Sequence, residues 1–115
     1  MGSDPLAVVE RFNDAFNRQD LDSVMELMTE DCIFEDTDPP PDGARHQGAA
    51  AVRAGFGDFF RSTPTANFVA EEQFGIGDRA VVRWIFTWGD GHVRGVDVFR
   101  IRDGKVAEKL AYVKG

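Results

Sequence analysis

The sequence is poor in cysteine, in basic residues and in long apolar stretches, and each shortage excludes a class of protein. Cys32 is the single cysteine, so neither an intrachain disulfide nor a cysteine-ligated zinc site is expected. No apolar run approaches the roughly 18 residues of a membrane-spanning helix, and no signal-peptide pattern is visible. The 13 lysines and arginines are outnumbered by 20 aspartates and glutamates, which disfavours nucleic acids and anionic membranes. We therefore expect a cytoplasmic protein without nucleic-acid or membrane partners.

Apolar and aromatic residues, by contrast, are plentiful. Hydrophobic residues make up 43% of the 115 residues, and ten of them are phenylalanines, as is typical of a globular domain. This length suits one hydrophobic core, so we expect a single domain over residues 1–115. His46 and His92 are far apart and lack acidic neighbours at the spacing of a metal site. We therefore expect neither a metal nor another cofactor.

The first half of the chain shows helical spacing of its apolar residues. They recur every three or four positions after Asp4, which is suited to cap a helix. A second, shorter helix is predicted after Asp20, and a third from residue 47 to 61. Between these helices we expect a strand at 31–36 and an irregular loop at 38–43, where three prolines follow one another.

The second half changes to the two-residue periodicity of β-strands. Strands are predicted at 67–74 and 79–88, and a hairpin over 91–115 turns at Asp103-Gly104, a dipeptide that tolerates positive φ angles. Helices followed by antiparallel strands indicate an α+β fold, with the helices covering one sheet face. Large rings share one face of the 79–88 strand, namely Trp84, Phe86 and Trp88. If the sheet curves, these rings would surround a cavity.

Asp97 stands between two valines in the predicted hairpin, where a carboxylate is unexpected unless its face is polar or functional. Its partner depends on the turn. A two-residue turn places Asp97 opposite Leu110, where it could stay protonated, whereas a three-residue turn places it opposite Lys109, where it would be ionised. Because a one-residue slip exchanges the two faces of a strand, the sequence leaves both arrangements open.

Several segments together resemble one known superfamily. They are VVERFNDAFNRQD at 8–20, the strand ending in FED at 34–36, HQGAAAVR at 46–53 and DVFRIRDGKVAE at 97–108. In this order, over nearly the whole chain, they are similar to the nuclear-transport-factor-2-like superfamily, and within it to ketosteroid isomerases and SnoaL-like polyketide cyclases. The resemblance implies a cone-shaped α+β barrel. Three N-terminal helices would pack on a curved, mixed, mostly antiparallel sheet around an internal pocket, usually in a homodimer.

The resemblance also implies site residues. Asp36 matches the catalytic base of the isomerases, and Asp97 matches the aspartate that donates a hydrogen bond to the substrate oxygen. Phe12 stands where the isomerases carry a tyrosine donor, so half of that oxyanion hole is not expected. The predicted ligand-contacting residues are those on inward faces: Phe12, Phe16, Phe34, Phe56, Phe60, Trp84, Phe86 and Lys109.

Two carboxyl groups in an apolar pocket can act as a general acid and base, because desolvation raises their pKa. We therefore expect cofactor-free isomerase, cyclase or lyase chemistry on a small apolar carbonyl compound. Asp36 would move the proton and Asp97 would polarise the oxygen. Alternatively, Asp36 is a loop acid bonded to backbone amides, Asp97 is a structural acid paired with a cation, and the domain is a non-catalytic ligand-binding or dimerisation module.

Overall fold

The computed structural model describes residues 4–65 and 67–114, so residues 1–3, 66 and 115 of the predicted domain lie outside the described residues. The elements in chain order are α1 (Pro5–Asn17), α2 (Leu21–Glu26), β1 (Met28–Glu35), β2 (Arg45–Gln47), α3 (Ala49–Ser62), β3 (Asn67–Ile76), β4 (Arg79–Trp88), β5 (Gly91–Arg102) and β6 (Lys105–Val113). No helix in the described part is long and apolar enough to cross a bilayer.

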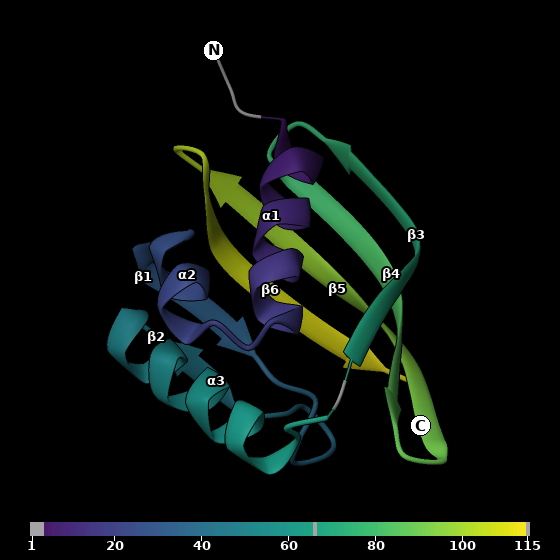
Figure 1. The fold of residues 1–115 in the computed structure, drawn as a ribbon. Coiled ribbons are helices and arrows are strands. Elements are labelled where there is room, and N and C mark those ends of the chain that lie inside the picture. Colours follow the sequence, from purple (N-terminus) through teal and green to yellow (C-terminus); the bar gives the residue numbers. More distant parts are fainter. Residues whose placement is uncertain (1–3, 66, 115) are drawn as a thin grey trace.

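The strands form one six-stranded sheet in the order β2-β1-β6-β5-β4-β3. The β1–β6 pair is parallel, and the other neighbouring pairs are antiparallel. The sheet curves around α1 without closing into a complete barrel (Figure 1). This arrangement confirms the predicted α+β fold with three helices on a mixed, mostly antiparallel sheet.

Local sequence explains where the first two helices begin. The Asp4 side chain accepts a hydrogen bond of 3.0 Å from the Leu6 N–H, and Asp20 accepts one of 3.2 Å from the Ser23 N–H. These side chains satisfy backbone donors that the first helical turn leaves free. Helix α1 then packs across β3 to β6, while α3 packs on β1 and β2 (Figure 1).

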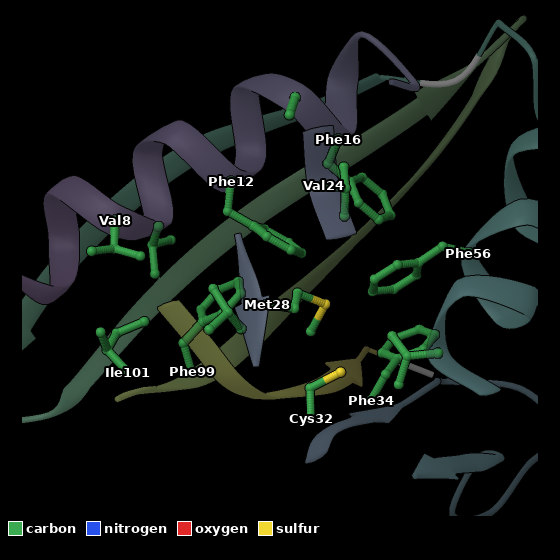
Figure 2. Close-up of a cluster of buried hydrophobic side chains, with 14 of the residues drawn as sticks. Val8, Phe12, Phe16, Val24, Met28, Cys32, Phe34, Phe56, Phe99 and Ile101 are labelled. Carbon is green, nitrogen blue, oxygen red and sulfur yellow. The ribbon is translucent and has the colours of Figure 1, made fainter. Parts of the chain in front are cut away.

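The hydrophobic core lies where these two helices meet the sheet. Figure 2 shows Phe12 of α1 and Phe56 of α3 pointing toward each other, with Phe99 of β5 nearby. The Phe12 ring centre is 6.2 Å from that of Phe56 and 5.8 Å from that of Phe99, both edge-on. All three side chains are fully buried, which contributes about 1.5–3 kcal/mol each to folding. The core therefore fixes α1 and α3 relative to the sheet.

Several elements differ from the prediction. Strand β1 begins at Met28 rather than at residue 31. Strand β2 was not predicted, and α3 starts at Ala49, two residues later than expected. Strand β3 continues to Ile76. Long-range pairing explains the early start of β1 and the presence of β2. Met28 lies opposite Val106 of β6, and β2 pairs with β1.

Candidate functional site

The β5–β6 hairpin decides what Asp97 faces. The turn has two residues, Asp103 and Gly104, with φ angles of 55° and 74°, as expected for a tight hairpin. The register then shifts, because Ala107 is an extra residue on β6, and Asp97 lies opposite Ala111. Both registers considered from the sequence are therefore wrong, since a bulge beyond the turn was not foreseen.

Lys109 is two residues from Ala111 on the same strand, so it lies on the same face and reaches Asp97 diagonally. Its Nζ is 3.6 Å from Asp97 Oδ2, an ion pair that is longer than a hydrogen bond. The two residues are only 4% and 5% exposed. The ammonium also lies 4.7 Å from the ring centre of Phe16 and 5.1 Å from that of Phe34, within the range of cation–π attraction.

Burial dominates the acidity of Asp97. It raises the pKa of this carboxyl above the ordinary value of 3.8, because the charged form loses its hydration. The Lys109 ammonium and the Trp84 indole oppose this rise by favouring the carboxylate, but they do not outweigh it. Asp97 therefore binds its proton more tightly than an exposed aspartate.

Two cavities meet at this ion pair. The larger, which we call the aromatic cavity, has a volume of about 240 Å³ and is lined by Phe16, Phe34, Asp36, Thr37, Phe59, Phe68, Trp84, Phe86, Trp88, Val93, Asp97, Lys109, Ala111 and Val113. The smaller, which we call the polar cavity, has a volume of about 160 Å³ and is lined by Glu10, Asn13, Asp14, Phe16, Asn17, Phe68, Ala70, Gln73, Val82, Trp84, Asp97 and Lys109. Because a cavity of roughly 150 Å³ can hold benzene, the aromatic cavity is large enough for a ring-bearing molecule.

Asp36 lies in the wall of the aromatic cavity, directly after β1. Its backbone N–H donates to Ala44 O at 2.9 Å, which closes the proline-rich loop, and its Oδ1 accepts from the Thr37 N–H at 2.7 Å. Gly43 has a φ of 78°, and a Cβ at that position would lie 1.6 Å from the Asp36 carbonyl oxygen. Glycine at this position therefore allows the loop to return closely enough to hold Asp36 at the cavity.

Most predicted site residues come together around the aromatic cavity: Asp36, Asp97, Phe16, Phe34, Trp84, Phe86 and Lys109. Three others line neither cavity. Phe12, Phe56 and Phe60 belong to the buried core, and ligand contact by these rings stays a prediction. Their rings instead pack on Phe16 at 5.9, 5.2 and 4.9 Å between centres, and Phe16 is the aromatic residue of α1 that reaches the cavity.

Several lining residues were not predicted. Phe59, Phe68 and Trp88 are the largest of them. Strand alternation did place Trp88 on the same face as Trp84, and it could have identified Trp88. Phe68 lies opposite Phe86 in the β3–β4 pair, a register that only the folded sheet establishes. The polar cavity was also missed, because α1 and β3 contribute its side chains from distant parts of the chain.

Comparison with known proteins places this fold in one class. The family model for the SnoaL-like domain matches residues 9–109. A nuclear-transport-factor-2-like protein of unknown function from Mesorhizobium loti is 41% identical, with a TM-score of 0.84 over 96% of this chain and 91% of that one. A candidate polyketide cyclase from Sinorhizobium meliloti is 26% identical, with a TM-score of 0.80 over 92% and 94% of the two chains. No curated protein matches the sequence.

A third structure, a candidate ketosteroid isomerase from Kribbella flavida, has a TM-score of 0.80 at 22% identity, covering 95% of this chain and 76% of that one. At this identity the likeness concerns the fold alone. The structures therefore define a nuclear-transport-factor-2-like domain. Within that superfamily, the chain belongs to the SnoaL-like domain family.

Proposed function

We propose that this domain binds a small, apolar carbonyl compound and catalyses proton transfer on it without a cofactor. The observation that carries the proposal is the lining of the aromatic cavity, where Asp36 shares one aromatic wall with the buried Asp97–Lys109 pair. An apolar cavity with a few polar groups is the usual form of a small-molecule site. The reaction would be of the isomerase, cyclase or lyase type.

In this proposal Asp36 is the general base. It takes a proton from the carbon next to the carbonyl, and the electrons of that C–H bond move onto the carbonyl oxygen. Lys109 is the positive group available in the cavity wall to stabilise the resulting enolate oxygen. Asp36 then returns its proton to the same or another carbon, so the reaction consumes no co-reactant.

Asp97 has a different role here from the one expected by analogy with the isomerases. Its Oδ2 faces the Lys109 ammonium at 3.6 Å, so it holds that cation in the cavity wall instead of donating to the substrate. Asp97 would be a positioning residue for Lys109. Its own high pKa, caused by burial, would make the strength of the pair depend on pH.

The test is hydrogen exchange on 2-tetralone, a bicyclic ketone with an acidic C–H beside its carbonyl. The protein is incubated with the ketone in deuterated buffer, and loss of the proton signal is followed by NMR. We expect Asp36→Asn to reduce exchange by 10²-fold or more, on the order of a general base contribution. Asp38→Asn, which changes an exposed acid of the same loop, should leave the rate unchanged. Exchange that is equal in both variants would contradict the proposal.

A non-catalytic ligand-binding module is the second candidate. Phe12 favours it, because the residue that the resemblance matches to the isomerases' hydroxyl donor is here a phenylalanine, and its ring is fully buried. The same measurement separates the two functions: saturable binding of 2-tetralone with no exchange above the buffer rate supports a binding module.

We further propose a cytoplasmic homodimer that associates through the outer face of the sheet. The support is the group of exposed apolar side chains there, which includes Val69, Phe74 and Ile76 of β3 and Tyr112 of β6. Each is adjacent in sequence to a residue that faces inward, so it points away from the helices. The single cysteine agrees with a reducing compartment.

A further inference from the structure

The boundary between the two cavities contains one residue that is less firmly packed than the others. Five residues line both cavities: Phe16, Phe68, Trp84, Asp97 and Lys109. All of them except Phe68 are buried, with at most 6% of their surface exposed. Phe68 is half-buried and lies near the start of the edge strand β3 (Figure 1). Because close packing fixes buried side chains, Phe68 is the part of the boundary whose position depends on other restraints.

The Phe68 ring packs against aromatic rings of the boundary and of the aromatic cavity. Its centre is 5.1 Å from that of Trp84 and 5.8 Å from that of Phe16. It is also 4.4 Å from the ring centre of Phe86, which lies opposite Phe68 on β4 and lines the aromatic cavity but not the polar one. The Phe68 ring therefore closes the aromatic cavity on the side of the polar cavity.

The backbone of Phe68 is held by a side chain of α1. Asn17, the last residue of that helix, donates from Nδ2 to the Phe68 carbonyl oxygen at 2.8 Å and accepts at Oδ1 from the Phe68 N–H at 3.0 Å. An edge strand leaves such backbone groups without a strand partner on its outer side. A carboxamide offers one donor group and one acceptor, so Asn17 pairs with Phe68 as a neighbouring strand would.

A second side chain holds the other end of the connection from α3 to β3. Gln19 Nε2 donates to the Thr63 carbonyl oxygen at 2.9 Å, directly after α3. Asn17 and Gln19 thus attach the two ends of this connection to the end of α1. Loss of the Asn17 side chain should therefore release Phe68 while Gln19 keeps α3 in place.

We propose that Asn17 is a specificity-determining residue, which limits the size of the ligand by holding Phe68 as a wall between the two cavities. With this wall in place, the ligand has the aromatic cavity of about 240 Å³, which suits a compound of one or two fused rings. With Phe68 displaced, the polar cavity of about 160 Å³ would join it, and a third ring could enter. Asn17 acts on the ligand through Phe68. The inference rests on the ligand-binding part of the proposed function and does not require catalysis.

The first test compares the binding of 2-tetralone and of 6-phenyl-2-tetralone, which carries a third ring, by calorimetry. We expect the wild type to bind 2-tetralone about tenfold more tightly, on the order of the size discrimination that an apolar pocket provides. Asn17→Leu should bring this ratio toward one, and Phe68→Ala should reverse it. A purely structural role of Asn17 would weaken the binding of both ketones equally.

The matched control is Asn13→Leu, the same change one turn earlier on α1. Asn13 lines the polar cavity, but it forms no hydrogen bond with Phe68, whose backbone N–H and carbonyl group are bonded to Asn17. This variant should keep the wild-type ratio. Equal affinities of the two ketones in the wild type, or a ratio that survives Asn17→Leu, would overturn the inference.

The second test needs no ligand and isolates the two hydrogen bonds. Asn17→Asp keeps the shape of the side chain and an acceptor for the Phe68 N–H, whereas Asn17→Leu keeps neither hydrogen bond. We expect exchange of the Phe68 amide proton in deuterated buffer, followed by NMR, to become about tenfold faster in Asn17→Leu. The increase should be smaller in Asn17→Asp and absent in Asn13→Leu. An unchanged rate in Asn17→Leu would show that Asn17 does not hold Phe68.

These outcomes separate the inference from the proposed function. Exchange of 2-tetralone that depends on Asp36, together with an unchanged ligand preference in Asn17→Leu, would support the function and overturn the wall. A preference that is lost in Asn17→Leu, without exchange that depends on Asp36, would do the reverse. No saturable binding of either ketone would reject both.

Discussion

At the scale of single residues, the Asp97–Lys109 pair is the feature that departs most from ordinary protein surfaces. Two charged groups have left water, and their separation of 3.6 Å is too long for a strong hydrogen bond. Burial of such a pair costs several kcal/mol per ion, on the order of what the mutual attraction returns. The pair therefore adds little net stability, and replacing both residues by apolar ones should show this.

Asp97 should titrate at a higher pH than an exposed aspartate, because its pKa is raised above 3.8 by burial. The folded protein then binds this proton more tightly than the unfolded chain. The resulting stabilisation is complete below the unfolded pKa and is lost as the pH rises through the folded pKa. As the pH rises from the unfolded pKa through the folded pKa, we expect the free energy of unfolding of the wild type to decrease relative to that of Asp97→Asn. Carbon-detected NMR of the Asp97 carboxyl checks the pKa directly, and a midpoint at or below 3.8 would contradict the prediction.

Lys109→Met should be strongly destabilising, because it leaves Asp97 buried without a cation. We expect the free energy of unfolding in urea to fall by about 3–5 kcal/mol. The double variant Asp97→Leu with Lys109→Met should recover most of this loss, since an apolar pair has no charge to solvate. Lys105→Met, on the same strand but exposed, provides the control and should change stability by no more than about 0.5 kcal/mol. Similar losses at Lys105 and Lys109 would show that the buried pair has no special energetic role.

At the scale of elements, the two strands of the final hairpin position the site through a single irregularity. The extra residue Ala107 on β6 shifts the register, so that Asp97 faces Ala111 and meets Lys109 diagonally. Further along β5, Gly95 allows close approach to both neighbouring strands. A Cβ there would lie 2.3 Å from the Tyr112 carbonyl oxygen on β6. Backbone atoms cannot move aside as a flexible side chain can.

Gly95→Ala should therefore destabilise the sheet by about 1–3 kcal/mol, the usual cost of overpacking, and should displace Trp84. Gly57→Ala makes the same chemical change in α3, where the nearest atom to the new Cβ is the flexible Arg61 guanidinium at 3.4 Å. There we expect a gain of roughly 0.5–1 kcal/mol, because alanine is favoured over glycine in helices. Urea unfolding followed by tryptophan fluorescence measures both. Equal effects of the two substitutions would contradict the close approach at Gly95.

At the scale of the whole molecule, one face of the sheet is covered by helices and the other is exposed. The inner face, covered by α1 and α3, contains the core and the two cavities. The outer face carries exposed apolar side chains, among which Ile76 is 79% exposed and Tyr112 is 55% exposed. Exposed apolar side chains grouped on one face are typical of interaction surfaces.

If the outer face is the proposed dimer interface, sedimentation of the wild type should give twice the mass of one chain. Ile76→Lys should shift the equilibrium toward the monomer, because a buried unpaired charge is costly at an interface. Ala50→Lys, an exposed position on α3, should leave the mass unchanged. A wild type that is monomeric at all accessible concentrations would rule out this interface.

Local interactions made much of the molecule predictable from its sequence. The caps at Asp4 and Asp20, the turn at Asp103-Gly104 and the alternation along β4 depend on neighbours within a few residues, and each is found in the structure. The resemblance then added the family's fold and the positions Asp36 and Asp97. Long-range pairing was not predictable in this way, and β2 and the early start of β1 were missed.

The amino-acid sequence alone thus determined the helices, the hairpin and the presence of an aromatic inner face, because short-range hydrogen bonding and side-chain alternation specify them. Only the tertiary structure decided which phenylalanines fill the core and which line the cavity, because rings on the same face compete for the same space. It also decided the partner of Asp97. One unpaired residue, Ala107, moves every later residue of β6 by one position relative to β5, and no local preference reveals that shift.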